Sequence, residues 1–264
     1  MKTALQMQLR GEELILKIKI DGKEYIGKQG ETILELAKRK NINIPNLCHK
    51  KGFEGLGRCR MCLVEIKDGK RKKLVSSCAY PLKNDLEVTT NNDELYKIRQ
   101  DIVMLLLLRS PENKYIQNLG KEYNVKVPTR YFSQYNDDCI LCGLCVKACE
   151  ELGTNAISMV SRGTLKKVST PYDDESKDCI GCGACAEVCP TNAIKLTEKD
   201  GQRTIWNRTF NLVSCEICGK YYTTEEALKY VEGLLDGEEE RICETCKKKI
   251  TAEKFKESFK NISL

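Results

Sequence analysis

The feature that most constrains the fold of this chain is its set of 16 cysteines, most of which lie two or three residues from another cysteine. Such spacings direct sulfur atoms toward a common metal ion or cluster, whereas they close poor disulfide loops. The first ten residues, Met1 to Arg10, lack the apolar segment of a signal peptide, and the longest aliphatic run, Ile102 to Leu108, is too short for a spanning helix. We therefore expect a cytoplasmic protein with reduced, metal-binding cysteines and no membrane insertion.

The formal net charge of +6 at pH 7 does not by itself indicate nucleic-acid binding. An iron–sulfur cluster with its four thiolates has a charge of about −2, so about three clusters would cancel this excess. The basic runs Lys70–Lys73 and Lys247–Lys249 are short and lack interleaved aromatic residues. Such runs are typical of a solvated face or of a patch that contacts a partner protein, and we expect no nucleic-acid partner.

Residues 1–90 have the pattern of a small α+β domain. From Leu14 to Ile20 apolar residues alternate with polar ones, which predicts a half-buried strand. Asp21-Gly22 predicts a hairpin turn into a second strand over residues 23–27. Thr32 and Glu35 form a capping box that predicts the start of a helix. A hairpin, a helix and then a cysteine-bearing loop predict a β-grasp ferredoxin domain.

Four cysteines of this block follow the spacing C-x10-C-x2-C-x15-C: Cys48, Cys59, Cys62 and Cys78. Four thiolates suit one 2Fe-2S cluster, and glycines at positions 52, 55 and 57 allow the loop to wrap around it closely. A structural zinc site is the alternative. Zinc ribbons have short two-to-four-residue knuckles on both sides of the metal, so the long first spacer favours the cluster.

Three stretches of this block resemble a known family: Ile44 to His49 (IPNLCH), Gly57 to Glu65 (GRCRMCLVE) and Ser77 to Pro81 (SCAYP). They look like the two-iron domain that opens the large iron–sulfur subunit of respiratory complex I and of its relatives, NAD-linked hydrogenases and formate dehydrogenases. The first spacer departs from plant-type ferredoxins, in which it has four residues. We expect His49 to form a hydrogen bond in the loop, since a cysteine is available for each ligand position.

Residues 91–135 contain no cysteine or histidine and are predicted to form a helical connector. Asp93 is expected to cap the first helix, and a second helix is expected around Tyr115 to Tyr123. Members of the resembling family usually bind a further four-iron cluster in this region through one histidine and three cysteines. Those ligands are missing here, so we expect packing helices without a cluster. The expected apolar stripe of the first helix consists of Leu95, Ile98, Ile102, Leu105 and Leu106.

Residues 136–200 contain two copies of C-x2-C-x2-C-x3-C, which is the run of bacterial ferredoxins with two 4Fe-4S clusters. In that pattern three cysteines of a run bind one cluster and the fourth binds the other. A short strand is expected after each run, over residues 156–160 and 193–197. Zinc is a much weaker alternative for this spacing. The two predicted ligand sets are Cys139, Cys142, Cys145 and Cys189, and then Cys179, Cys182, Cys185 and Cys149.

Residues 201–264 contain two C-x2-C pairs, which are Cys215 with Cys218 and Cys243 with Cys246. We expect these four to bind one structural zinc ion, because paired knuckles can place four thiolates tetrahedrally around one metal. A further iron–sulfur cluster is the alternative. Between the pairs, Thr223 and Glu226 predict a capping box and a helix with Ala227, Leu228, Val231 and Leu235 in its apolar stripe.

The sequence contains no glycine-rich dinucleotide fingerprint, P-loop or nucleophile elbow, so we expect no substrate-transforming site. A chain of clusters relays single electrons, and we expect an electron-transfer subunit of a multisubunit NAD(P)H-linked oxidoreductase, with electron bifurcation compatible with this role. The alternatives are a free-standing soluble polyferredoxin and a zinc-rich nucleic-acid-binding protein. The resemblance implies three partners: a flavin-bearing NAD(P)H-oxidising subunit, a thioredoxin-like 2Fe-2S subunit, and a catalytic subunit such as a hydrogenase, a formate dehydrogenase or a tungsten or molybdenum oxidoreductase.

Overall fold

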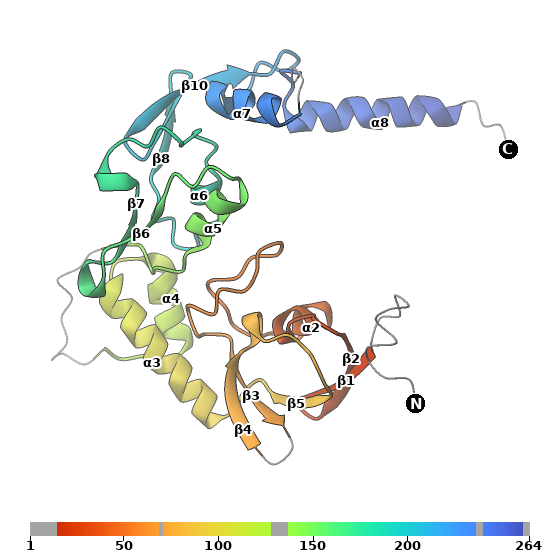
Figure 1. The fold of residues 1–264 in the computed structure, drawn as a ribbon, viewed down its shortest axis with the longest axis vertical. Helices are drawn as coiled ribbons and strands as arrows, with labels where there is room; N and C mark the ends of the chain where they lie inside the picture. The colour runs from red at the N-terminus through yellow and green to blue at the C-terminus, as the bar shows by residue number, and fades with distance from the viewer. Residues whose placement is uncertain (1–14, 69–70, 128–136, 236–239, 261–264) are drawn as a thin grey trace. The chain divides into compact units, whose positions relative to one another are not determined.

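A computed structural model describes residues 15–68, 71–127, 137–235 and 240–260 of the chain (Figure 1). The segment 1–10, Leu14 in the first expected strand, and Lys70 in the first basic run lie outside the described residues. The chain divides into two compact units. The first consists of residues up to 144 together with 189–193, and the second consists of residues 145–188 and the chain from 194 onward.

The first unit contains a five-stranded mixed sheet in the order β2-β1-β5-β3-β4. β1 and β5 are parallel, and the other neighbours are antiparallel. Leu16, Ile18 and Ile20 of β1 are buried in the core, as the alternation predicts, because successive side chains of a strand point to opposite faces. The strands are β1 (Ile15–Ile20), β2 (Lys23–Lys28), β3 (Leu63–Asp68), β4 (Arg71–Ser76) and β5 (Leu86–Thr89).

Helix α2 (Ile33–Arg39) packs its apolar face on this sheet, which gives the predicted β-grasp arrangement (Figure 1). The predicted capping box is present, since the Thr32 hydroxyl accepts from the Glu35 N–H at 3.2 Å and the Glu35 carboxylate accepts from the Thr32 N–H at 2.8 Å. A short 3₁₀ helix, η1 (Ser77–Ala79), follows β4. The helix therefore begins at the predicted position and directs the chain into the first cysteine loop.

The connector forms helices α3 (Asp93–Arg109) and α4 (Lys114–Glu122), which pack on each other with stacked rings of Tyr96 and Tyr123. The predicted cap of α3 is wrong by one residue, because the Asn92 side chain accepts from the Leu95 N–H at 2.8 Å. The predicted stripe is also partly wrong, since Leu105 is 61% exposed. The buried residues of α3 are Leu95, Arg99 and Val103.

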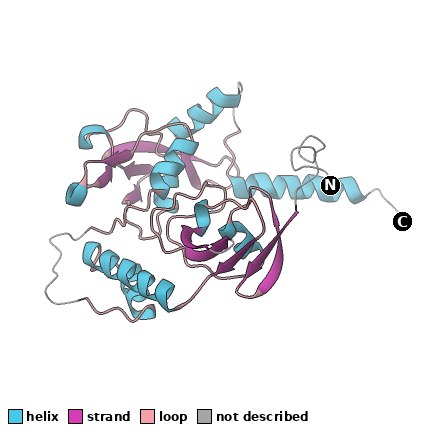
Figure 2. Ribbon diagram, turned by 60° about the horizontal axis from the view of Figure 1, so that its bottom comes forward, coloured by secondary structure: helices cyan, strands magenta, loops and turns pink. Residues whose placement is uncertain are grey.

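The second unit combines short helices with two small antiparallel sheets, one of order β6-β7 and one of order β11-β10-β9-β8. Figure 2 distinguishes its helices and strands by colour. The first strand after each cysteine run forms later than predicted, because residues 156–157 and 193–195 lie in the turns that return the chain from the cysteines. The elements are α5 (Leu144–Glu151), β6 (Ser158–Val160), η2 (Gly163–Leu165), β7 (Lys167–Ser169), η3 (Pro171–Asp173), α6 (Ala184–Glu187), β8 (Leu196–Lys199), β9 (Gln202–Ile205) and β10 (Arg208–Ser214).

The C-terminal part of the second unit contains β11 (Tyr221–Thr224), α7 (Glu225–Leu235) and α8 (Glu244–Lys260). The predicted capping box at Thr223 and Glu226 is wrong, because the Thr224 hydroxyl accepts from the Ala227 N–H at 3.2 Å. The predicted stripe of α7 is only partly buried, with Val231 40% and Leu235 62% exposed. None of the helices in the described ranges is long and apolar enough to cross a membrane.

Candidate functional site

The four N-terminal cysteines converge although the chain places 29 residues between the first and the last. Cys48 lies in the loop after α2, Cys59 and Cys62 precede β3, and Cys78 lies in η1. The Cys59 N–H donates to the Cys48 Sγ at 3.4 Å, and the Leu47 N–H donates to the Cys59 Sγ at 3.4 Å. Each N–H stabilises a negative sulfur, which is the form that binds iron.

Because these four sulfurs lie close together, the pKa is lowered for two of the cysteines and raised for the other two. Contacts with Cys59 and Cys78 lower the pKa of Cys48 to about 2, while the contact with Cys48 raises the pKa of Cys59. The contact with Cys78 lowers the pKa of Cys62 to about 6, and contacts with Cys48 and Cys62 raise the pKa of Cys78. Sulfurs this close share protons, and a bound metal centre replaces those protons.

The loop that carries Cys59 passes very close to the last cysteine. A Cβ atom on Gly55 would lie 1.8 Å from the carbonyl oxygen of Cys78, so this position requires glycine. Gly57 has φ +60° and faces Ser76, and only glycine adopts that conformation without strain. This close wrapping is the fit expected for a loop around a small cluster. Of the three glycines predicted to allow it, Gly55 is required by this clash, whereas Gly52 and Gly57 are favoured by their positive φ of +94° and +60°.

His49 contacts a lysine. Its Nδ1 lies 2.9 Å from the Nζ of Lys38. Partial burial, followed by the nearby Lys38 charge, lowers the pKa of the imidazole. The ring therefore forms the hydrogen bond expected from the sequence, but its partner lies in helix α2 and not in the loop.

Arg99 is a functional residue that the sequence analysis missed. It is only 3% exposed and donates to the carbonyl oxygens of Met61 (3.1 Å), Leu63 (2.8 Å) and Thr90 (2.8 Å). Met61 and Leu63 flank Cys62, so the guanidinium holds both sides of that cysteine. No carboxylate pairs with Arg99 in the described ranges, and its charge lies close enough to Cys62 to interact with it.

The second unit encloses a small cavity whose wall contains four of the predicted ligands: Cys149, Cys179, Cys182 and Cys185. Cys149 comes from α5 of the first run, whereas the other three come from the second run. The structure therefore brings together the crossed set that the repeat predicts. The remaining lining is largely apolar, including Ile157, Ile180 and Ile205, which suits a cluster held away from water.

Side chains from later strands fix the second cysteine run. Arg208 donates to the carbonyls of Ser176, Lys177 and Cys179 at 2.8–3.0 Å. Arg203 donates to the carbonyls of Gly181 and Cys182 at 2.8 and 3.2 Å. The sequence signal for these contacts is weak, since arginines on a short strand are common on protein surfaces.

Aromatic and hydroxyl groups complete this support. A Cβ on Gly181 would lie 2.6 Å from the Phe210 ring, so the ring packs directly on the backbone of the cysteine run. The Thr224 hydroxyl, which is fully buried, donates to the Ile180 carbonyl at 2.5 Å. The Trp206 indole N–H donates to the Cys185 Sγ at 3.4 Å. Burial raises the pKa of Cys185 to about 11, and the indole N–H opposes that rise.

The other predicted four-iron set is divided between the units, because Cys139, Cys142 and Cys189 belong to the first unit and Cys145 to the second. Within the first unit, the Ala193 N–H donates to the Cys189 Sγ at 3.3 Å. Burial raises the pKa of Cys142 to about 11. The grouping of Cys145 with the other three stays a prediction from the spacing.

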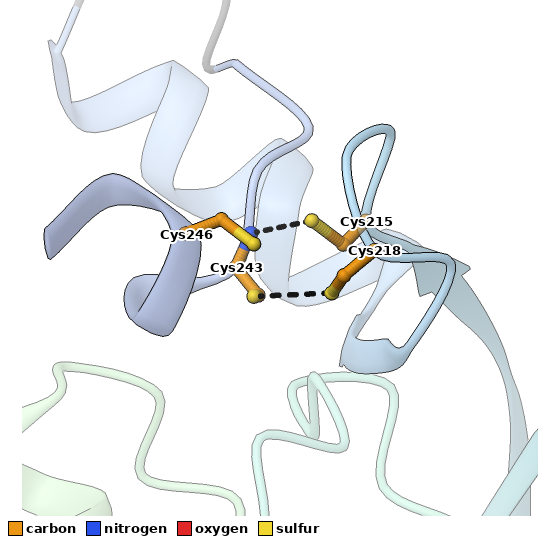
Figure 3. A group of neighbouring side chains, drawn as sticks. All are labelled: Cys215, Cys218, Cys243 and Cys246. Carbon is orange, nitrogen blue, oxygen red and sulfur yellow. Dashed lines mark hydrogen bonds between the residues drawn. The ribbon is translucent and has the colours of Figure 1, made fainter. Parts of the chain in front are cut away.

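The C-terminal cysteines form the tightest group (Figure 3). The sulfur atoms of Cys215, Cys218, Cys243 and Cys246 all lie within 4.8 Å of one another, and Cys218 and Cys243 are 3.7 Å apart. The Cys243 N–H donates to the Cys215 Sγ at 3.3 Å. This backbone hydrogen bond is the main reason why the pKa of Cys215 is lowered to about 6. Across the described ranges, no other group of three or more metal-ligating side chains is this compact.

Comparison with protein families matches two domains to the chain. A 2Fe-2S iron-sulfur cluster binding domain matches residues 15–93. A 4Fe-4S dicluster domain matches residues 138–193 and 178–221. These matches confirm the predicted order of a two-iron domain followed by a four-iron dicluster domain.

Several curated proteins are similar to this chain. The NADPH-Fe(3+) oxidoreductase subunit alpha of Geobacter sulfurreducens is 32% identical over 180 residues, covering 59% of this chain and 21% of that protein. The NADH-ubiquinone oxidoreductase 75 kDa subunit of Reclinomonas americana is 29% identical, covering 59% of this chain and 26% of that protein. The chain thus spans about a fifth to a quarter of the length of these relatives, and the resemblance to complex I-type iron–sulfur subunits is confirmed.

A solved structure has a similar fold. A chain of an NAD+-reducing NiFe-hydrogenase, crystallised in the H2-reduced state, aligns with a TM-score of 0.59 and 23% sequence identity. The alignment covers 67% of this chain and 86% of the hydrogenase chain.

Proposed function

Because this chain joins a 2Fe-2S cluster domain to a 4Fe-4S dicluster domain, we propose that it is an electron-transfer subunit of a multisubunit NAD(P)H-linked oxidoreductase. It would pass single electrons between a flavin-bearing NAD(P)H-oxidising subunit and a catalytic subunit. The observation that best supports this proposal is the convergence of a separate set of four cysteines in each unit. Relatives named as subunits of NADPH- and NADH-linked oxidoreductases support the same role.

Three ligand sets would hold the clusters. The first set would bind one 2Fe-2S cluster, in which each iron takes two thiolates, and the other two sets would each bind one 4Fe-4S cluster. When bound, these groups supply one-electron redox chemistry, and the chain supplies the thiolates, the N–H donors and the exclusion of water. The three sets are Cys48, Cys59, Cys62 and Cys78, then Cys139, Cys142, Cys145 and Cys189, and then Cys149, Cys179, Cys182 and Cys185.

The C-terminal cysteines would bind one zinc ion. Zn–S bonds of about 2.3 Å in a tetrahedron place sulfurs about 3.8 Å apart, and the Cys218–Cys243 separation is 3.7 Å. Ligands of different irons in a cluster are separated by the iron and sulfide atoms between them, so four sulfurs within 4.8 Å of one another fit a single ion better. The site would stabilise the fold at the end of the described chain.

Iron analysis of anaerobically purified protein tests the cofactor content. We expect about ten irons per chain, two from the first set and eight from the other two, and one zinc. Iron near six would contradict one of the four-iron assignments. An eleventh iron per chain in place of zinc, with no matching increase in acid-labile sulfide, would show that the C-terminal site binds mononuclear iron.

Cys78→Ala tests the two-iron assignment directly. We expect the variant to contain about eight irons and to lose the 2Fe-2S EPR signal while the four-iron spectra persist. Loss of a four-iron signal instead would mean that Cys78 belongs to a different centre.

Reduction by NADH tests the partner. We expect the flavin-free chain to stay oxidised with NADH alone and to become reduced once a flavin-containing NADH-oxidising subunit from the same complex is added. Steady NADH oxidation by the isolated chain would contradict the proposal. Purification of the chain from its host as a monomer with no co-purifying subunit would favour the free-standing polyferredoxin.

A further inference from the structure

Trp206 occupies a backbone position that disfavours tryptophan. Ile205 pairs with Arg208 across the β9–β10 hairpin, so Trp206 and Asn207 form its two-residue turn, with φ of 52° and 63°. Such turns need left-handed φ at both positions, which asparagine and glycine adopt readily and bulky residues do not. Residues held in this region cluster at functional sites, where the surroundings compensate the strain. Trp206 therefore calls for a reason beyond turn formation.

The contacts of the indole ring supply that reason. Its Nε1–H donates to the Cys185 Sγ at 3.4 Å. The ring also forms part of the wall of the cavity that contains Cys149, Cys179, Cys182 and Cys185. The left-handed turn thus places the side chain against the cysteine cavity rather than in solvent.

Other donors to the cysteine sulfurs occur in both repeats. The Cys149 sulfur accepts from the Ala156 N–H at 3.2 Å and lies 3.1 Å from the Thr154 hydroxyl. The Cys189 sulfur accepts from the Ala193 N–H at 3.3 Å and lies 3.7 Å from the Thr191 hydroxyl. Since Cys149 and Cys189 are assigned to different clusters, each centre has an equivalent pair of donors, although the hydroxyl lies closer to its sulfur at Cys149.

Trp206 breaks this equivalence, because it is the only tryptophan in the chain and an indole donor can serve only one cluster. Hydrogen bonds to ligand sulfurs are one of the factors that set the potentials of iron–sulfur clusters. A donor stabilises the reduced cluster more than the oxidised one, since the reduced cluster is more negative. The effect of Trp206 is therefore directed to the cluster that contains Cys185.

We propose that Trp206 is a positioning residue that raises the reduction potential of the Cys149–Cys179–Cys182–Cys185 cluster relative to its neighbour, through the N–H bond to Cys185. This inference rests on the proposed function, because it requires Cys185 to be a cluster ligand. A higher potential favours the cluster that contains Cys185, over the other four-iron cluster, as the one that holds the electron.

Trp206→Phe tests the proposal, because it keeps an aromatic ring and removes the N–H. In an EPR-monitored redox titration of the full chain, we expect the reduced-to-oxidised ratio of one four-iron cluster to fall roughly fivefold at a fixed potential. Trp206→His retains a ring N–H and should restore part of the ratio. Tyr172→Phe is the matched control, since Tyr172 also has a positive φ, of 56°, but is 95% exposed.

A measurement on the unaltered chain covers the case in which the variants fold poorly. Incorporation of ¹⁵N-indole tryptophan labels Trp206 alone, and pulsed EPR of the reduced protein should show a ¹⁵N coupling to one four-iron cluster. Absence of that coupling, or unchanged potentials in Trp206→Phe at full iron content, would overturn the role of Trp206. Iron near six in the unaltered chain would instead overturn the proposed cofactor content.

Discussion

A buried arginine links the first cysteine loop to helix α3. Arg99 donates to carbonyls on both sides of Cys62 and to the Thr90 carbonyl after β5. A guanidinium is suited to this position because its planar fork of N–H groups can satisfy several acceptors at once. The connector helix is therefore also a support for the cysteine loop.

We expect Arg99→Met to destabilise the first unit by about 3 kcal/mol, because three buried carbonyls lose their donors. Arg99→Lys should recover only part of this loss, since an ammonium cannot reproduce the fork geometry. The midpoint of urea-induced loss of the 2Fe-2S visible circular dichroism measures the effect. Equal midpoints for Arg99→Met and the unaltered chain would show that the contacts contribute nothing to stability.

Gly55→Ala should prevent assembly of the 2Fe-2S centre, because the added Cβ would lie 1.8 Å from the Cys78 carbonyl oxygen. Gly52→Ala is the matched control in the same loop, since no atom lies within 4 Å of its Cβ position and only its positive φ is strained. That control should cost about 1 kcal/mol and keep the cluster. The 2Fe-2S EPR signal reports both outcomes.

At the residue scale, the spacing alone was enough to predict the cysteines as ligands. A short spacing such as C-x2-C places its thiolates close together through local turn geometry. It could not identify Arg99 or Arg203, since their acceptors are backbone carbonyls that lie 36 and 22 residues away in the chain. A charged residue on a helix or strand is usually solvated. Only the tertiary structure shows that these side chains are turned toward the cysteine loops.

At the scale of elements, the C-terminal cysteines join segments that have few apolar contacts of their own. The buried residues that form their common cluster are Cys215, Cys243 and Cys246, with Tyr222 and Ile242 packed against them. In Figures 1 and 2, helix α8 extends away from the sheet of its own unit, and its Phe255 is 66% exposed. We therefore expect the position of α8 to depend on the cysteine site.

Metal removal should release α8 without unfolding the four-iron region. After treatment of the full chain with a zinc chelator, we expect faster amide hydrogen exchange over residues 244–260, because metal binding supplies much of the folding free energy of such small sites. Exchange over residues 179–189 should stay slow, and the brown colour should persist. Unchanged exchange in α8 would show that the helix is stable without metal.

Element prediction succeeded where local signals were strong and failed where tertiary contacts decided. The Thr32–Glu35 capping box is local and formed as predicted. The cap of α7 shifted from Thr223 to Thr224, because the Thr224 hydroxyl also donates to the Ile180 carbonyl, 44 residues away. The strands after the cysteine runs shifted for a similar reason, since Ala156 and Ala193 donate to cysteine sulfurs.

At the scale of the whole molecule, the bound metals determine the net charge. The chain has a formal charge of +6 and a sequence pI of about 8.5. Three clusters and one tetrathiolate zinc, each at about −2, would bring the net charge to about −2. The loaded protein is therefore expected to differ in charge sign from the apoprotein at neutral pH.

Anaerobic isoelectric focusing checks this expectation. The loaded chain should focus below pH 7, and the apoprotein unfolded in urea should focus near its sequence value, since the thiols of an unfolded chain are largely neutral at pH 7. Cys78→Ala, which lacks one cluster, should focus between the two. An identical position for loaded and apo forms would contradict the cofactor count.

The placement of the single tryptophan also has an optical consequence. Trp206 contacts a predicted cluster ligand through its indole nitrogen, and the absorption of iron–sulfur centres overlaps tryptophan emission. The fluorescence of Trp206 should be quenched in the loaded protein and should increase as the Cys185 centre is lost. Oxygen damage to that one centre could then be followed in real time with the purified protein in a stopped-flow cell, without any added dye.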